Sequence, residues 1–123
     1  MGFNAVVVES DPRVAKTLAG GLASHFYSIH LARSGEDLRE RVAKNRPEVV
    51  ILDMEYSRLA DLRNLHHDFP SLPIVCTHRV PDERLWIDAL EAGATDVCAV
   101  NDVQDVLTSA LRSVAAAAKT AAA

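Results

Sequence analysis

The sequence predicts a doubly wound α/β fold, in which helices cover both faces of a parallel sheet of five strands. Five short apolar segments, at residues 5–8, 28–32, 48–52, 74–77 and 97–100, alternate with amphipathic segments of helical length. The first and third segments are continuously apolar, as strands covered on both faces should be. The second alternates between polar and apolar residues, which is typical of a strand at the edge of a sheet.

The first two connecting segments carry signals for helix starts. Asp11 followed by Pro12 predicts the start of a first helix, whose apolar residues recur every four positions as far as Phe26. Ser34 with Asp37 resembles a capping box at the start of the second helix. These signals place one helix after the first strand and one after the second.

The remaining three helices also have start or stop signals in the sequence. Pro70 ends a third helix, and Asp82 and Gly93 begin and end a fourth. Asn101 or Asp102 begins the fifth, which carries an apolar stripe. We expect one domain over residues 1–114, because this length can bury its own core. The alanine-rich residues 115–123 either prolong the last helix or form a linker.

Composition narrows the class of protein. The chain has 17 acidic and 13 basic residues, a net charge of −4, and its basic residues in 39–46 are interleaved with acidic ones. Binding to nucleic acid needs a clustered basic face, so no nucleic-acid partner is expected. No apolar run approaches bilayer length and no signal peptide begins the chain, which predicts a cytoplasmic protein without a membrane partner. Cys76 and Cys98 lie in apolar segments and are interpreted as buried thiols.

Acidic residues follow two of the predicted strands. Glu9, Ser10 and Asp11 come directly after the first strand, and Asp53 follows the third. With strand order 2-1-3-4-5, the carboxyl ends of these two strands meet where the strand order reverses. Carboxylates gathered there suit Mg²⁺, and a metal-bound aspartate can attack a phosphoryl group. The simpler alternatives are that Asp11 only caps a helix and that Asp53 is only a polar strand end.

Four motifs form an ordered set that covers almost the whole chain. They are Val-Val-Glu-Ser-Asp-Pro at residues 7–12, Pro-Glu-Val-Val-Ile-Leu-Asp-Met at 47–54, Leu-Pro-Ile-Val at 72–75 and Ala-Gly-Ala-Thr-Asp at 92–96. This set resembles the receiver domain of bacterial response regulators, the CheY-like superfamily. The resemblance implies a flavodoxin-like (βα)5 fold and a role in a two-component phosphorelay, with a histidine kinase or another signalling protein as partner.

The resemblance also implies roles for individual residues. Asp53 occupies the phosphoacceptor position, and Glu9, Asp11, Asp53 and the backbone carbonyl of Glu55 are the candidate ligands of Mg²⁺. Chemistry would be limited to self-catalysed phosphoryl transfer onto Asp53, so the chain is not expected to be an enzyme in any wider sense.

Several positions depart from the family pattern. Ser10 stands where a second acidic residue usually binds the metal, which weakens the expected Mg²⁺ site. The switch Ser/Thr position holds His78, with Thr77 one residue early, and the lysine position holds Val100. Arg79 is a candidate replacement cation and His78 a candidate hydrogen-bond donor. The alternative for both, which we favour, is that they are exposed loop residues.

Two functions therefore compete. One is an atypical receiver that is phosphorylated on Asp53, and the other is a pseudo-receiver that acts as an interaction module without phosphorylation. A flavodoxin-like cofactor binder is disfavoured, because no glycine-rich loop follows the first strand.

The expected interaction surface is the face formed by the fourth helix, the fifth strand and the fifth helix, which receivers use and through which this chain would form a homodimer. Trp86 in the fourth helix is either an exposed anchor for a partner or a core residue packed beside Leu85, Ala89 and Leu90. We favour the core interpretation.

Overall fold

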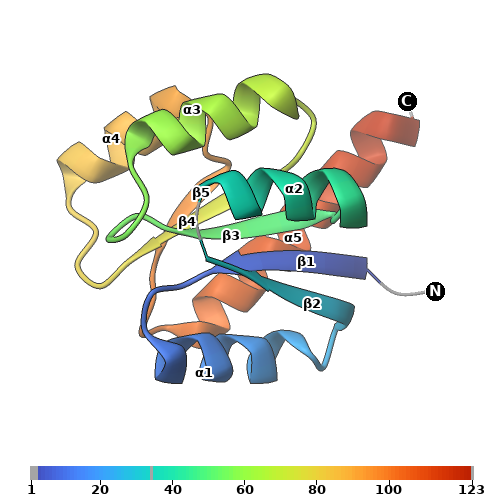
Figure 1. The fold of residues 1–123 in the computed structure, drawn as a ribbon, viewed down its shortest axis with the longest axis horizontal. Coiled ribbons are helices and arrows are strands. Elements are labelled where there is room, and N and C mark those ends of the chain that lie inside the picture. Colours follow the sequence, from blue (N-terminus) through green and yellow to red (C-terminus); the bar gives the residue numbers. More distant parts are fainter. Residues whose placement is uncertain (1–2, 34, 123) are drawn as a thin grey trace.

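Five parallel strands form one sheet with the order β2-β1-β3-β4-β5, as predicted (Figure 1). The structure is a computed structural model that describes residues 3–33 and 35–122. The strands are β1 (Phe3–Val8), β2 (Phe26–Ala32), β3 (Val49–Asp53), β4 (Ile74–His78) and β5 (Asp96–Ala99). β2 and β5 lie at the two edges, and β1 and β3 are neighbours although two helices and another strand separate them in sequence.

Five helices connect and cover the strands. They are α1 (Pro12–Leu22), α2 (Gly35–Asn45), α3 (Leu59–Asp68), α4 (Glu83–Ala92) and α5 (Val103–Ala122). α1 and α5 cover one face of the sheet, and α2, α3 and α4 cover the other (Figure 1). The fold is therefore the doubly wound, flavodoxin-like (βα)5 arrangement that the sequence predicts.

Alternate residues of the central strands contribute to two separate cores. Val6 and Val50 belong to the core beneath α2, α3 and α4, whereas Val7 and Ile51 belong to the core beneath α1 and α5. Burying one aliphatic side chain of this size contributes about 1.5–3 kcal/mol. Because successive side chains of a strand point to opposite faces, a strand covered on both faces is apolar throughout. All five residues of β3 are buried, including Asp53 at its end.

The boundary between the first helix and the second strand differs from the prediction. The four-residue spacing indicated a helix as far as Phe26, but α1 ends at Leu22 and Phe26 is the first residue of β2. Phe26 pairs with Phe3 of β1, and their rings lie 6.4 Å apart. Pairing with a distant strand thus overrides the local helical period at this position.

The helix caps follow the sequence closely. Asp11, Asp82 and Asp102 each accept a hydrogen bond from a backbone N–H in the first turn of the following helix, so Asp102 rather than Asn101 caps α5. Gly93 ends α4 with φ of 118°, a conformation that favours glycine. The predicted capping role of Ser34 lies outside the described residues.

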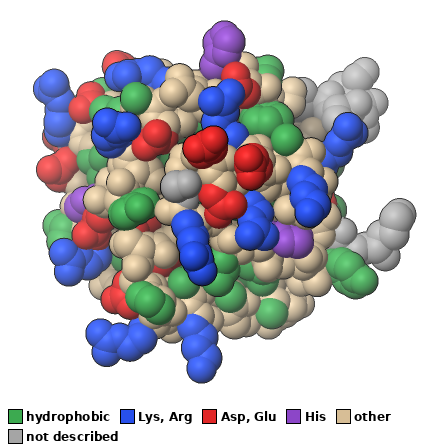
Figure 2. Space-filling view, in the orientation of Figure 1, with side chains coloured by type: hydrophobic (Ala, Val, Ile, Leu, Met, Phe, Trp, Pro, Cys, Tyr) green, Lys and Arg blue, Asp and Glu red, His purple; other side chains and the backbone are tan. Residues whose placement is uncertain are grey.

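α5 continues as one helix beyond the predicted domain boundary at residue 114. It runs from Val103 to Ala122, so the alanine-rich segment prolongs the helix instead of forming a linker over the residues described. Within the described part of the chain, no helix is long and apolar enough to cross a membrane. Figure 2 shows acidic and basic side chains interspersed over the face that carries α2 and α3, as their interleaving in the sequence indicates.

The preferred interpretation of Trp86 as a core residue is wrong. Its side chain is 44% exposed and that of Leu90 is 43% exposed. The buried stripe of α4 is formed by Ala89 and Ala92, with Leu85 partly buried against the same core. Those residues are separated by three or four positions, and Trp86 and Leu90 lie on the next stripe around the helix.

The two cysteines are buried, as predicted. Cys76 belongs to the core beneath α2, α3 and α4, and Cys98 to the opposite core. Burial raises the pKa of each thiol to about 12. Both thiols are therefore protonated and unreactive near neutral pH.

Candidate functional site

The ends of β1 and β3 bring the predicted acidic residues together. Val8 of β1 and Leu52 of β3 are paired in register, so the residues that follow them, Glu9 and Asp53, lie side by side at the carboxyl end of the sheet. Because Asp53 ends a fully buried strand, only 3% of its surface is exposed. The predicted convergence of these two segments, 43 and 44 residues apart, is therefore observed.

Both oxygens of the Asp53 carboxylate accept hydrogen bonds. Oδ2 accepts from the hydroxyl of Ser10 at 2.9 Å and from the Ser10 backbone N–H at 3.2 Å. Oδ1 accepts from the backbone N–H of Glu55 at 2.9 Å. Charge-assisted hydrogen bonds of this kind satisfy a carboxylate that would otherwise be costly to bury. They also fix the orientation of its two oxygens relative to the rim of the sheet.

The sequence does not predict the contact between Ser10 and Asp53. Residue type indicates only that Ser10 is a poor substitute for an acidic metal ligand, whereas its hydroxyl donates directly to Asp53. A small hydroxyl residue in the turn after the first strand was the available signal, but its partner depends on the pairing of β1 with β3.

Glu9 lies beside Asp53 with one oxygen unsatisfied. Its Oε2 accepts the backbone N–H of Asp11 at 3.0 Å, whereas Oε1 is buried and has no hydrogen-bond partner. Burial raises the pKa of the Glu9 carboxyl above its ordinary value; the nearby charge of Asp53 adds to this shift, and the hydrogen bond from Asp11 opposes it. The Glu9 carboxylate thus lies beside that of Asp53 with its buried Oε1 unpaired, which makes the ionised form of Glu9 unfavourable here.

Asp11 caps the start of α1. Its Oδ1 accepts the backbone N–H of Arg13 at 2.9 Å and lies 4.0 Å from the Arg13 guanidinium. This is the helix-capping interpretation that the sequence left open. A metal-binding role for Asp11 remains a prediction.

Glu55 and Arg79 connect the loops that follow β3 and β4. The carboxylate of Glu55 accepts the Nε–H of Arg79 at 2.9 and 3.1 Å and the Arg79 backbone N–H at 2.7 Å. The Arg79 side chain is 79% exposed, as expected for a loop residue. The candidate replacement cation is thus held by Glu55 in this state of the protein.

Thr77 and His78, before and at the switch position, differ in burial and in hydrogen bonding. Thr77 pairs in register with Asp53, is fully buried, and its hydroxyl oxygen has no hydrogen-bond partner. His78 ends β4, half-buried, and its Nδ1 accepts the backbone N–H of Val80 at 3.1 Å. Because that nitrogen acts as an acceptor, His78 stabilises the loop locally through it.

Solved structures share this fold. A receiver-domain protein described as CheY-like from Methanospirillum hungatei superposes with a TM-score of 0.86 over 98% of this chain and 99% of its own, at 13% identity. The beryllofluoride-activated receiver domain of DrrB gives a TM-score of 0.79 over 92% and 97%, at 21% identity. At these identities the likeness concerns the fold alone.

Sequence relatives decide the family. No family model matches the chain. The response regulator MprA of Mycobacterium sp. (strain KMS) is 31% identical, over 78% of this chain and 43% of that protein. The chain belongs to the response-regulator receiver family. This homology supports a role in two-component signalling, although the receiver domain spans less than half the length of the curated relatives it matches.

The lysine position of this receiver domain cannot supply a cation. Val100 is 6% exposed and packs in the core beneath α1 and α5. Beside it lies a hollow of about 370 Å³, lined also by Asp11, Arg13 and Asn101. An apolar side chain at this position can neither pair with the Asp53 carboxylate nor neutralise a group attached to it.

The described residues contain no group of three or more His, Cys, Asp or Glu side chains arranged to hold a metal ion. The receiver domain instead offers the pair Glu9 and Asp53, and the buried oxygen of Glu9 without a partner fits a cation. Hard carboxylate oxygens suit Mg²⁺, which commonly binds through one or two carboxylates and keeps several water ligands. The donor set therefore fits a weakly held Mg²⁺.

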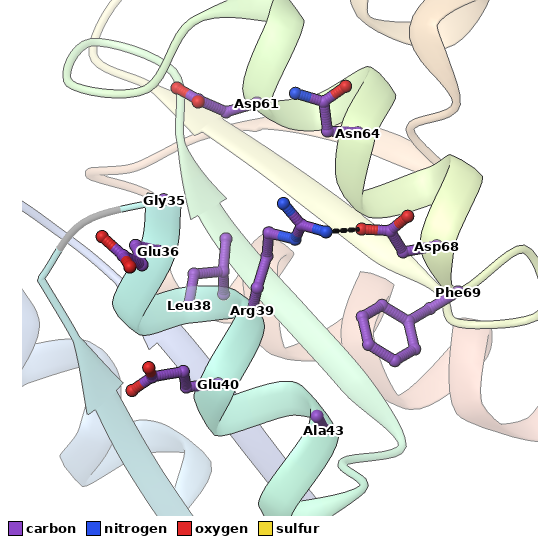
Figure 3. A pocket seen from close by; sticks show the side chains of 10 residues that line it. All are labelled: Gly35, Glu36, Leu38, Arg39, Glu40, Ala43, Asp61, Asn64, Asp68 and Phe69. Carbon is purple, nitrogen blue, oxygen red and sulfur yellow. Dashed lines mark ion pairs between the residues drawn. The ribbon is translucent and has the colours of Figure 1, made fainter.

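A second hollow of about 690 Å³, lined mostly by polar and charged residues, lies between α2 and α3 (Figure 3). Arg39 of α2 reaches across it to Asp68 at the end of α3, with 2.6 Å between Nη2 and Oδ2. None of Glu9, Ser10 or Asp53 lines it. This hollow is separate from the acceptor site, and the ion pair ties the two helices together across it.

Proposed function

We propose that this receiver domain accepts a phosphoryl group on Asp53 from a histidine kinase, as part of a two-component pathway. The observation that carries the proposal is the pair formed by Asp53 and Glu9, in which a buried carboxylate oxygen of Glu9 lacks any partner. A structural salt-bridge network would pair that oxygen, whereas a site that takes up a cation leaves it free.

Mg²⁺ would be held by Glu9, Asp53 and the backbone carbonyl of Glu55, with Asp11 in the adjoining turn. When bound there, the ion would supply positive charge that lowers the repulsion between the Asp53 carboxylate and an incoming phosphoryl group. The chain itself orients the nucleophile, because Ser10 holds Oδ2 and the Glu55 N–H holds Oδ1. The proposed chemistry is limited to this phosphoryl transfer onto Asp53.

A second function, an interaction module that works without phosphorylation, is favoured by two observations. The Ser10 hydroxyl already satisfies Asp53 Oδ2, and Val100 removes the cation that the family uses to sense the phosphoryl group. Under this alternative the fold presents a constant surface to its partner.

Under either function we propose that partners bind the face formed by α4, β5 and α5, and that a second copy of the chain binds there to form a homodimer. Trp86, Ile87 and Leu90 on α4 are 43–47% exposed. Large side chains that are exposed together on one helix are typical of anchors in protein interfaces.

The deciding experiment is intact-mass analysis after incubation with Mg²⁺ and a small acyl-phosphate donor. The wild type, Asp53→Asn and Glu9→Gln are compared, each with and without Mg²⁺. A single phosphoryl adduct that requires Asp53, and that forms more slowly in Glu9→Gln, supports the phosphoacceptor function. A wild type that gains no adduct at high donor concentration supports the phosphorylation-independent module.

A further inference from the structure

The ion pair between Glu55 and Arg79 joins the acceptor loop to the loop that leads into α4. Glu55 binds Asp53 through its backbone N–H and Arg79 through its carboxylate, so one residue contacts both. Three hydrogen bonds link Glu55 to Arg79, including one to the Arg79 backbone. A pair fixed at both the backbone and the side chain restrains the loop more firmly than a side-chain pair alone.

Arg79 is close enough to Asp53 to exchange partners. Asp53 pairs with Thr77, and Arg79 follows two residues later, one residue beyond the end of β4 at His78. Adjacent strands are about 4.8 Å apart and two residues advance about 6.6 Å, which places the two Cα atoms roughly 8 Å apart. An extended arginine side chain spans most of such a distance, and the Arg79 side chain is 79% exposed, so little packing opposes a change of partner.

Arg79 also lies shortly before α4 in the sequence. Asp82 caps α4 three residues after Arg79, and Trp86 lies in the first turns of that helix. His78 holds the intervening Val80 through a hydrogen bond to its backbone, so a shift of Arg79 is transmitted through a short, restrained segment.

We propose that Arg79 replaces the missing lysine as the residue that senses the phosphoryl group, and that Glu55 is the positioning residue that holds Arg79 away until Asp53 is modified. This inference rests on the proposed phosphorylation of Asp53. The phosphoryl group attracts the guanidinium by bidentate hydrogen bonding and repels the Glu55 carboxylate. Arg79 then leaves Glu55, its backbone contact to Glu55 breaks, and the start of α4 moves.

The exchange of partners by Arg79 makes the contacts of the unmodified and modified states differ. Val100, at the lysine position, cannot provide such a difference. A ligand shifts an equilibrium only through contacts that differ between the states. Here the unmodified state has the Glu55–Arg79 contacts, and the modified state has contacts between Arg79 and the phosphoryl group in their place.

The test uses beryllofluoride with Mg²⁺ as an analogue of the phosphoryl group. Fluorine NMR reports whether the analogue is bound, and emission from Trp86, the single tryptophan of the chain, reports on α4. In the wild type we expect binding to change the Trp86 emission. In Arg79→Ala the analogue should bind more weakly, because one of its contacts is lost. Once the fluorine signal shows full occupancy, the emission change should still be less than about a third of the wild-type change, and Arg79→Lys, which keeps the charge, should restore part of it.

Glu55→Gln should favour the exchanged state, so half of the emission change should need roughly fivefold less analogue than in the wild type. Arg41→Ala is the matched control, because Arg41 is also an exposed arginine paired with a carboxylate, Asp37 at 3.3 Å, but on α2. This control should respond like the wild type.

The outcomes separate the two proposals. A wild type that shows no bound fluorine signal overturns the phosphorylation of Asp53, and the exchange with it. A wild type that binds the analogue while Arg79→Ala keeps the full emission change overturns only the role of Arg79. Loss of the response in Arg79→Ala with the fluorine signal intact supports both.

Discussion

The Ser10 hydroxyl lies 2.9 Å from Oδ2 of Asp53, and this contact connects the ends of β1 and β3 directly. In the family pattern an acidic residue stands at the position of Ser10. Its carboxylate and that of the acceptor aspartate both face a metal ion. The serine instead satisfies the acceptor carboxylate without any cation. The unmodified Asp53 carboxylate is therefore satisfied without a metal ion, whereas the buried Oε1 of Glu9 has no hydrogen-bond partner.

Replacing Ser10 by aspartate should restore the dependence of the site on a cation. Ser10→Asp removes the hydrogen bond to Asp53 and adds a third carboxylate, so the melting temperature should fall without Mg²⁺. Mg²⁺ should bind roughly tenfold more tightly than to the wild type, a difference of about 1.4 kcal/mol. Thermal melts over a Mg²⁺ titration measure both effects.

Two variants serve as controls for Ser10→Asp. Ser10→Ala removes the same hydrogen bond without adding charge, and Ser71→Asp adds the same charge to an exposed residue after α3. If Ser71→Asp shows an equal response to Mg²⁺, the effect is one of overall charge and the assignment of Ser10 to the site is wrong.

Glu9→Gln should raise stability at neutral pH. Burial raises the pKa of Glu9, so the folded protein binds more protons than the unfolded chain between the ordinary pKa and the raised value. The stability contributed by protonated Glu9 is therefore fully present below the ordinary pKa and is lost as pH rises through the raised one. Compared with Glu9→Gln, the wild type should lose melting temperature as pH increases across that window.

The measurement is a set of melting curves from about pH 4 to pH 8 in the absence of Mg²⁺. Glu36→Gln, on the exposed start of α2, is the control and should change little relative to the wild type. Parallel pH profiles for the wild type and Glu9→Gln would show that Glu9 does not carry the unfavourable charge.

Thr77→Val should stabilise the protein by about 1 kcal/mol, because the Thr77 hydroxyl is fully buried without a hydrogen-bond partner and valine has nearly the same shape. Thr95→Val provides the contrast, since Thr95 Oγ1 accepts the backbone N–H of Ile74 at 3.1 Å. That variant should lose about 1 kcal/mol. Urea unfolding of both variants tests the pair, and a destabilised Thr77→Val would reveal a partner for its hydroxyl.

Trp86→Ala should weaken self-association while leaving stability nearly unchanged. The Trp86 side chain is 44% exposed, so its removal costs little packing in the monomer. Leu85→Ala is the contrasting variant, because Leu85 packs against the core beneath α4 and its loss should lower the unfolding free energy by about 2 kcal/mol. Sedimentation velocity and thermal melting distinguish the two effects. Unchanged sedimentation in Trp86→Ala would remove this surface from the proposed dimer.

The sequence determined the architecture because its signals are local. A continuous apolar run ending in Asp53 indicates a strand covered on both faces, and Asp82 and Gly93 mark the ends of α4 through contacts within a few residues. Strand order and the convergence of Glu9 with Asp53 followed from the handedness of the connections. Local periodicity failed at Phe26, where pairing with Phe3 prevails.

The contacts that control the site were decided only by the tertiary structure. Ser10 and Asp53 are 43 residues apart, and Glu55 and Arg79 are 24 apart. Which side chains meet across such separations depends on strand register and loop conformation, and a shift of one residue in register would turn each side chain to the other face. The exposure of Trp86 has the same origin, because the packing of α4 on the sheet sets its rotation about its own axis. Residue types alone do not specify these pairings.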